Sequence, residues 1–368
     1  QGLEFSIDDL TFLYEINNKI EGFGWGTDPR IREIIEKRNQ KQDIANIFKV
    51  SEKEVATNLN EFKENKNIRV FYGSLKWNEE KVPSYFSELQ VILGDACFYS
   101  LTNAKGLESL QNIKGNADFN SLTSAKELSL LKNIGHHAYF DKLTSAEGLN
   151  SLQNIRGDAN FFNLTDAEGL ESLQNIGGYA NFKSLESAEG LESLKNIGYS
   201  ADFPSLTSAK RLNSLQNIGS DAEFDHLTSA EGLSLLQNIG GNAHFYNLTN
   251  AERLESLQNI GDNASFYSLT NAKGLESLQN IGGSASFYDL TNAEGLGSLQ
   301  NIGSHAYFDK LTNAEGLESL QNIGGDACFF SLTNAKELKS LQCVKGNVYF
   351  TKLTSIEENK KTSIKYHH

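Results

Sequence analysis

The chain has 368 residues and a formal net charge of −14 at pH 7. This acidity argues against a surface that binds nucleic-acid phosphates and against electrostatic adhesion to anionic lipids. No stretch approaches the ~20 consecutive apolar residues of a membrane-spanning helix, so we expect no membrane insertion. Residues 1–30 also lack a basic segment followed by an apolar core, so we expect no signal peptide there.

Residues 1–70 do not repeat and are predicted to form a small helical N-terminal cap or docking segment. Phe12–Ile20 and Ile31–Phe62 have the patterning of helices. The stretch Asp43–Val55 superficially resembles a helix-turn-helix, but Lys49 stands where that motif usually carries glycine. Acidic residues also crowd the second helix of the motif, whereas DNA requires a basic one, so we predict no nucleic-acid binding.

Residues 71–95 are predicted to form a degenerate capping repeat. Counting back 21 residues from the later units finds apolar residues at the core positions. These residues are Leu75, Trp77, Phe86, Leu89 and Ile92. An atypical terminal unit is what a stack of repeats needs to cover the core that its last full repeat would expose.

Residues 96–356 follow a strict 21-residue period. Phenylalanine recurs at Phe98, Phe119, Phe140, Phe161, Phe182, Phe203, Phe224, Phe245, Phe266, Phe287, Phe308, Phe329 and Phe350. A fixed period near 20 residues indicates a solenoid, in which each unit buries its apolar face against its neighbours. We therefore predict an α/β solenoid with a parallel sheet of about 13 rungs, followed by a polar tail at residues 357–368.

Each unit is predicted to be a strand followed by a short helix on the opposite face. The segment Gly-x-Ala-x-Phe alternates small or apolar with polar residues, which indicates a half-buried strand with alanine and phenylalanine inward. The segment beginning at Thr144 resembles a capping box with Glu147, and its apolar residues recur at every third position. Both features favour a short α- or 3₁₀-helix. The Asn-Ile-Gly-Gly that follows is expected to be a turn, with the asparagines forming a hydrogen-bonding ladder.

The pattern Leu-x-x-Leu-x-x-Ile-Gly-Gly-x-Ala-x-Phe resembles the leucine-rich repeat family, particularly bacterial and receptor L-domain-like repeats. Alanine and phenylalanine replace the strand leucines of the common motif, and Leu164 stands at its asparagine position. The resemblance implies a curved body whose concave parallel sheet binds protein partners, and it implies no catalytic residue. A secreted or cell-surface bacterial protein is the setting we favour, with a cytoplasmic one as the alternative.

One position of the strand segment differs from unit to unit. Between alanine and phenylalanine the chain carries Cys97, Asp118, Tyr139, Asn160, Asn181, Asp202, Glu223, His244, Ser265, Ser286, Tyr307, Cys328 and Tyr349. The position after phenylalanine is as diverse, whereas the helix-side position after the second leucine is almost always Gln or Lys. This contrast favours a recognition surface on the strand face of a rigid scaffold. Recent duplication, or packing between helices, would also explain the uniform helix side.

The candidate partner-binding residues lie at these variable positions or beside them. Tyr246, Tyr267 and Tyr288 fall on consecutive rungs beside His244 and predict an aromatic strip that contacts a partner. The alternative is that the stacked tyrosines only stabilise an exposed sheet. Further aromatic candidates are Tyr139, Phe162 and Tyr179.

An acidic patch forms the second group of candidates. It contains Asp202, Asp221, Glu223 and Asp225, with His226 and His244. Carboxylates near imidazoles can hold a divalent metal, but this spacing defines no coordination geometry, so we interpret the patch as solvated or cation-facing.

The sequence predicts a non-enzymatic binding module that recognises a protein or a glycan through its strand face. We expect no metal and no cofactor, because the chain lacks a phosphate-binding loop, metal-spaced cysteines and a nucleophile with a positioned base. We also expect a monomer. One alternative is a structural or self-associating bacterial surface protein. Another is an effector in which residues 3–67 carry the activity and the solenoid targets it.

Overall fold

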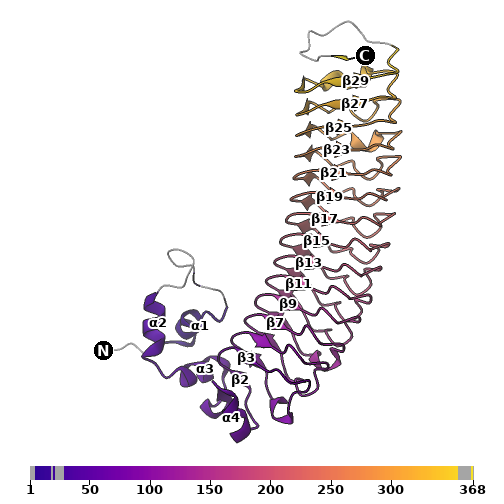
Figure 1. Cartoon of the computed structure of the whole chain (residues 1–368). Coiled ribbons are helices and arrows are strands. Elements are labelled where there is room, and N and C mark those ends of the chain that lie inside the picture. The colour runs from indigo at the N-terminus through magenta and orange to yellow at the C-terminus, as the bar shows by residue number, and fades with distance from the viewer. Residues whose placement is uncertain (1–4, 18–19, 21–28, 355–365, 368) are drawn as a thin grey trace. The chain divides into compact units, whose positions relative to one another are not determined.

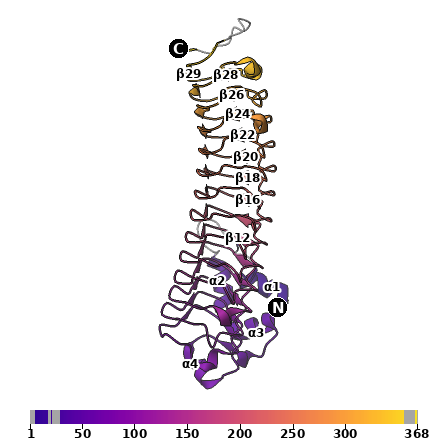
Figure 2. The same cartoon turned by 90° about the vertical axis from the view of Figure 1, so that its right-hand side faces the viewer.

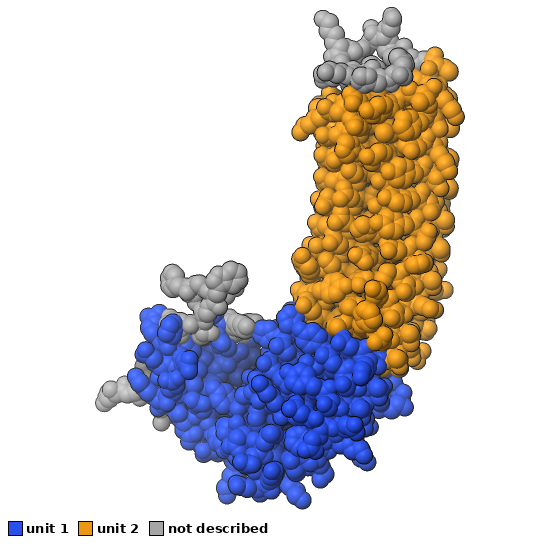
Figure 3. All heavy atoms as spheres, in the orientation of Figure 1, with its two compact units in different colours: residues 1–143, 147–156 blue, residues 144–146, 157–368 orange. Residues whose placement is uncertain are grey.

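The computed structural model describes residues 5–17, 20, 29–354 and 366–367. It contains two compact units, coloured separately in Figure 3. The N-terminal unit comprises Gln1–Leu143 and Glu147–Arg156, and the C-terminal unit comprises Thr144–Ala146 and Gly157–His368. The repeats form a parallel β-solenoid of about 13 turns. No helix among the described residues is both long and apolar enough to cross a membrane.

The N-terminal unit begins with short helices. They are α1 (Ile7–Leu13), α2 (Pro29–Glu36), α3 (Gln40–Phe48) and α4 (Leu59–Glu64), with a 3₁₀ turn η1 (Glu52–Glu54) and strand β1 (Val55–Ala56) between α3 and α4. The predicted helices Phe12–Ile20 and Ile31–Phe62 are therefore wrong in extent. Residue Lys49 ends α3 because it adopts the left-handed conformation, with φ of 54°. No second helix of a helix-turn-helix follows, since η1 leads directly into β1.

Helices α3 and α4 pack on the first strands of the N-terminal unit. Ile44 and Ala45 of α3 share a buried cluster with Val55, Val70 and Val91, which lie on successive strands. Phe62 of α4 is also buried, and its ring lies 4.6 Å from that of Phe86. The residues predicted as a degenerate repeat pair in the expected register, because Leu75 pairs with Ala96.

Each turn of the solenoid carries two strands of two or three residues, and not the single strand that we predicted. In Figures 1 and 2 the strands of the C-terminal unit stack rung upon rung; Figure 1 labels its odd-numbered strands, and Figure 2 labels mainly the even-numbered ones. One set has mainly Asn-Ile strands, which we call the asparagine strands. The other mainly begins with alanine, and we call these the alanine strands. The strands of each set pair in parallel, and the pairs within the repeats are shifted by one repeat.

In the N-terminal unit the first set comprises β1, β2 (Val70–Phe71), β4 (Val91–Ile92), β6 (Asn112–Ile113), β8 (Asn133–Ile134) and β10 (Asn154–Ile155). The second set there comprises β3 (Leu75–Lys76), β5 (Ala96–Cys97), β7 (Ala117–Asp118) and β9 (Ala138–Tyr139).

In the C-terminal unit the asparagine strands and their last neighbour are β12 (Asn175–Ile176), β14 (Asn196–Ile197), β16 (Asn217–Ile218), β18 (Asn238–Ile239), β20 (Asn259–Ile260), β22 (Asn280–Ile281), β24 (Asn301–Ile302), β26 (Asn322–Ile323) and β28 (Cys343–Val344). The alanine strands and their last neighbours are β11 (Ala159–Asn160), β13 (Ala180–Asn181), β15 (Ala201–Asp202), β17 (Ala222–Glu223), β19 (Ala243–His244), β21 (Ala264–Ser265), β23 (Ala285–Ser286), β25 (Ala306–Tyr307), β27 (Ala327–Phe329), β29 (Val348–Phe350) and β30 (Tyr366–His367). The predicted polar tail, residues 357–368, lies outside the described residues except for β30.

The helices predicted opposite the alanine strands are replaced mostly by tight turns. Only η2 (Ser84–Phe86), η3 (Lys126–Leu128), η4 (Glu294–Leu296) and η5 (Lys336–Ser340) are 3₁₀ turns among the described repeats. The reason is the glycine of the Glu-Gly-Leu segment. Gly190 has φ of 94°, and a Cβ atom there would lie 2.0 Å from the carbonyl oxygen of Ala167. Where this position is left-handed, as at Gly190, a helix cannot continue.

The predicted capping boxes are also wrong in detail. Thr165 donates its hydroxyl hydrogen to the carbonyl oxygen of Thr144 on the previous turn, at 3.1 Å. The next residue, Asp166, accepts from the backbone N–H of Glu168 at 2.9 Å. The residue after threonine therefore closes an Asx turn, while threonine links neighbouring turns.

The phenylalanines form the internal column that the period predicts. In the C-terminal unit, neighbouring rings from Phe161 to Phe350 lie 5.0 to 5.8 Å apart and within 15° of parallel. The alanines, leucines and isoleucines of the repeat are buried around them. Each ring thus packs on the same residue of the adjoining turn, which fixes the register of the stack.

The asparagines form a ladder, as predicted, although its bonds join side chains and not turn backbone groups. The Nδ2 atom of Asn238 donates to Oδ1 of Asn217 at 3.2 Å, and Asn259 donates to Asn238 at 3.1 Å. The same bond recurs along the asparagine strands up to Asn322. The ladder satisfies amide groups that the stacking would otherwise leave unpaired.

Candidate binding face

Two columns of variable residues lie in register on the alanine strands of the C-terminal unit. The inner column is the position between alanine and phenylalanine: Asn160, Asn181, Asp202, Glu223, His244, Ser265, Ser286, Tyr307, Cys328 and Tyr349. The outer column is the position after phenylalanine: Phe162, Lys183, Pro204, Asp225, Tyr246, Tyr267, Tyr288, Asp309, Phe330 and Thr351. Parallel pairing places each inner residue directly beside its counterpart on the next turn.

The predicted tyrosines do form a contiguous strip. The rings of Tyr246 and Tyr267 lie 5.0 Å apart, and those of Tyr267 and Tyr288 lie 5.1 Å apart. The strip continues diagonally to Tyr307 of the inner column, 5.4 Å from Tyr288. We call Tyr246, Tyr267, Tyr288 and Tyr307 the tyrosine strip. Tyr267 is 39% exposed, so the strip presents aromatic surface to solvent.

Small inner-column residues make room for these rings. Ser265 and Ser286 are only 7% and 8% exposed. Ser265 lies beside the phenol of Tyr246 and Ser286 beside that of Tyr288, and each serine opposes the rise in the pKa of its tyrosine. Tyrosines of the outer column therefore lie over the inner column and not straight out from the sheet. The candidates predicted from the sequence did not include Tyr307. Its contact with Tyr288 joins the inner column to the outer one, next to the small side chain of Ser286.

His244 joins the tyrosine strip to the acidic patch. Its Nδ1 atom lies 2.5 Å from the hydroxyl oxygen of Tyr246, and the two rings meet edge to face at 5.2 Å. On its other side, His244 pairs along the inner column with Glu223. The two predicted groups of residues are therefore neighbours on one surface.

Three carboxylates of the predicted acidic group form what we call the acidic patch from here on: Asp202, Glu223 and Asp225. Asp202 and Glu223 are paired neighbours on β15 and β17, and Asp202 accepts a hydrogen bond of 2.5 Å from the hydroxyl of Tyr179. The pKa of the Glu223 carboxyl is raised to about 7, first by desolvation and then by the charge and hydrogen bond of Asp202. The fold thus holds carboxyl groups close enough to oppose one another's ionisation.

Part of this negative charge has no lysine or arginine partner among the residues that the structure describes. Within the described part of the chain, the Oδ1 atoms of Asp202 and Asp225 are buried without a hydrogen-bond partner. No lysine or arginine of the described residues forms an ion pair with Asp202, Glu223 or Asp225. Their neighbour Asp221 differs, because its Oδ1 accepts from the backbone N–H of Asn242 at 2.7 Å and so serves the turn.

The remaining candidates are more dispersed. Phe162 is exposed at the start of the outer column, where the ammonium group of Lys183 lies 5.5 Å from its ring centroid. Tyr139 belongs to β9 of the N-terminal unit, beside His137. The structure groups Tyr179 with the acidic patch, and it leaves Phe162 and Tyr139 outside the cluster.

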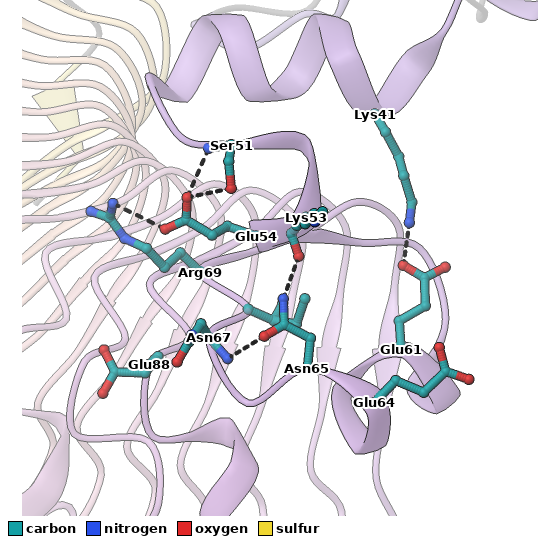
Figure 4. Close-up of a pocket in the computed structure, with 11 residues that line it drawn as sticks. Lys41, Ser51, Lys53, Glu54, Glu61, Glu64, Asn65, Asn67, Arg69 and Glu88 are labelled. Atoms are coloured by element: carbon teal, nitrogen blue, oxygen red, sulfur yellow. Dashed lines mark hydrogen bonds and ion pairs between the residues drawn. The ribbon is translucent and has the colours of Figure 1, made fainter.

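The N-terminal unit contains a cleft that sequence reasoning did not find. Its volume is about 790 Å³, and its lining includes Lys41, Glu54, Glu61 and Arg69 (Figure 4). Lys41 of α3 forms an ion pair with Glu61 of α4, and Arg69 lies 3.6 Å from Glu54. One ion pair links α3 to α4, and the other links η1 to the residue that precedes β2. No sequence pattern connects the residues, which are brought together only by the fold.

Among the described residues, no group of three or more His, Cys, Asp or Glu side chains is placed to hold a metal ion. No protein-family model and no curated protein sequence matches the chain significantly. The resemblance to leucine-rich repeats therefore stays a prediction, with which a 21-residue solenoid is compatible.

Proposed function

We propose that this chain is a non-enzymatic binding module that recognises a protein partner through the inner and outer columns of its C-terminal unit. The observation that carries the proposal is the tyrosine strip. Tyrosine is enriched at binding hot spots because it brings a large apolar area, a polar tip and few rotatable bonds. Four such rings side by side on a regular sheet give a surface of the kind that partners bury.

The scaffold supports this role. The phenylalanine column and the asparagine ladder repeat from turn to turn, so substitutions in the inner and outer columns leave the packing below them intact. A rigid surface loses little conformational entropy when it binds. The residues of the two columns can therefore differ from turn to turn and form a binding surface, while the core of the solenoid stays the same.

The proposal is tested by replacing the outer tyrosines. The intact chain is used to capture a partner, which is identified by mass spectrometry and then titrated in purified form. The triple variant Tyr246→Ala, Tyr267→Ala, Tyr288→Ala should lose at least about tenfold in affinity, because each 1.4 kcal/mol of lost contact weakens binding tenfold.

A matched control is available on the same unit. Tyr199 is 60% exposed but lies in neither column, so Tyr199→Ala removes exposed aromatic surface without touching the proposed face. This variant should bind as the parent does. Unchanged affinity in the triple variant, with its circular dichroism spectrum intact, would show that the strip is not the binding surface.

A further inference from the structure

We propose that the partner segment is cationic: an extended stretch containing arginine or lysine that lies across both the acidic patch and the tyrosine strip. The inference rests on the proposed function and adds the chemistry of the partner. It is carried by the juxtaposition of unpaired carboxylates with a row of exposed aromatic rings on one continuous sheet surface.

The two parts form one path along the solenoid. Parallel pairing connects Asp202 to Glu223, His244, Ser265, Ser286 and Tyr307 in turn. At ~4.8 Å per rung these steps span roughly 24 Å, which is about seven residues of extended chain. A short linear segment is therefore long enough to contact the carboxylates at one end and the tyrosines at the other.

The acidic patch requires a positive partner. Buried oxygen atoms of Asp202 and Asp225 have no hydrogen-bond donor among the described residues, and no described lysine or arginine forms an ion pair with Glu223. An apolar or anionic partner would bury these carboxylates further without pairing them, which is unfavourable. A guanidinium or ammonium group supplies both the missing hydrogen-bond donors and the counter-charge.

The tyrosine strip suits the same ligand. The face of an aromatic ring attracts cations, and the planar guanidinium of arginine also stacks on it. Partial burial raises the pKa values of Tyr246, Tyr288 and Tyr307, so their phenols stay protonated and neutral at physiological pH. Arginine side chains thus find carboxylates at one end of the face and ring surfaces along the rest.

The test uses defined peptides and the full chain. A fluorescently labelled peptide of nine alternating arginine and serine residues is titrated by anisotropy, and a peptide with glutamine in place of arginine serves as the neutral probe. We expect the arginine peptide to bind and the glutamine peptide not to bind. The affinity for the arginine peptide should fall as salt is raised.

Since the whole chain carries a charge of −14, local binding must be separated from general attraction. The patch variant Asp202→Asn, Glu223→Gln, Asp225→Asn should weaken binding at least about tenfold. The control variant Glu168→Gln, Glu294→Gln, Glu315→Gln removes the same formal charge from exposed sites outside both columns and should weaken it far less. Equal losses in the two variants would overturn the inference.

The captured partner separates this inference from the proposed function. If the patch variant and the tyrosine variant both bind the purified partner more weakly than the parent does, both proposals hold. If only the tyrosine variant loses it and salt has no effect, the face binds a protein that is not recognised by charge. Loss in neither variant overturns both proposals, and so does displacement of the partner by neutral oligosaccharides alone.

Discussion

The ionised side chain of Glu223 lowers the free energy of unfolding of the protein. Its pKa is raised from 4.5 to about 7 by desolvation and then by Asp202. Between these two pH values the folded chain binds more protons than the unfolded chain. Stability therefore falls as pH rises through this window. The charged carboxylate is retained at some cost to the free energy of folding, as expected of a residue placed for binding.

We predict that Glu223→Gln stabilises the protein at about pH 8 and has no such effect at about pH 4, where the carboxyl is protonated in both states. Because the side chain is exposed, solvent screening reduces the expected gain to about 1 kcal/mol. The measurement is the urea midpoint of parent and variant at both pH values.

Two histidines also lie near Glu223: His244 is its strand neighbour, and His226 follows it closely in the sequence. Both remain in the variant, so the difference between the two proteins isolates the carboxyl group. The matched control is Glu168→Gln, an exposed residue outside the patch, which should shift neither midpoint. A gain from Glu223→Gln that is as large at pH 4 as at pH 8 would contradict a raised pKa.

The asparagine ladder is the clearest case of an element that exists only through stacking. Each two-residue strand is too short to be stable alone, but its side chain joins a continuous row of hydrogen bonds. The row ends at Asn322, because the next turn carries Cys343 at the equivalent position. An asparagine within the row therefore makes two ladder bonds, and the asparagine at the end of the row makes one.

This difference gives a prediction within one residue type. Asn238 makes ladder bonds to Asn217 and to Asn259, whereas Asn322 has only its bond to Asn301. At about 1 kcal/mol for each net hydrogen bond, Asn238→Ala should cost about 2 kcal/mol and Asn322→Ala about 1 kcal/mol. Urea titration of the two variants measures both values. Equal costs would mean that the ladder bonds contribute little.

The elements differ in how far sequence can predict them. The phenylalanine period predicts the internal column and the parallel register, because both follow from repetition alone. The asparagine strands resemble turns in the sequence, since two residues are too few to show alternation. Gly190 and most of the equivalent glycines resemble weak helix positions in the sequence, although their left-handed conformation favours a tight turn.

The candidate face is predictable to a similar degree. Repeat spacing alone places Tyr246, Tyr267 and Tyr288 on adjoining turns. The diagonal contact with Tyr307 depends on how side chains lean across the sheet, and spacing does not contain that information. The cleft around Arg69 depends on helices that pack without any repeat, so no sequence pattern predicts it.

At the scale of the whole molecule, the C-terminal unit behaves as a one-dimensional array. Its alanine strands pair only with the equivalent strands one turn before and one turn after, and the phenylalanine rings stack in the same order. An array of this kind is stabilised by nearest-neighbour interfaces, so the number of turns is less important than their register.

We therefore predict that a whole turn can be removed. Deleting residues 310–330 takes out 21 residues and joins Asp309 to Ser331, which leaves every later side chain at its repeat position. The shortened protein should fold, keep the tyrosine strip, and melt within about 5 °C of the parent, because it loses one interface among many. Deleting only residues 310–319 joins Asp309 to Leu320 and takes the later turns out of register, so that variant should lose its cooperative melt. Circular dichroism during heating compares the two, and similar melting of both variants would show that register is not what holds the array together.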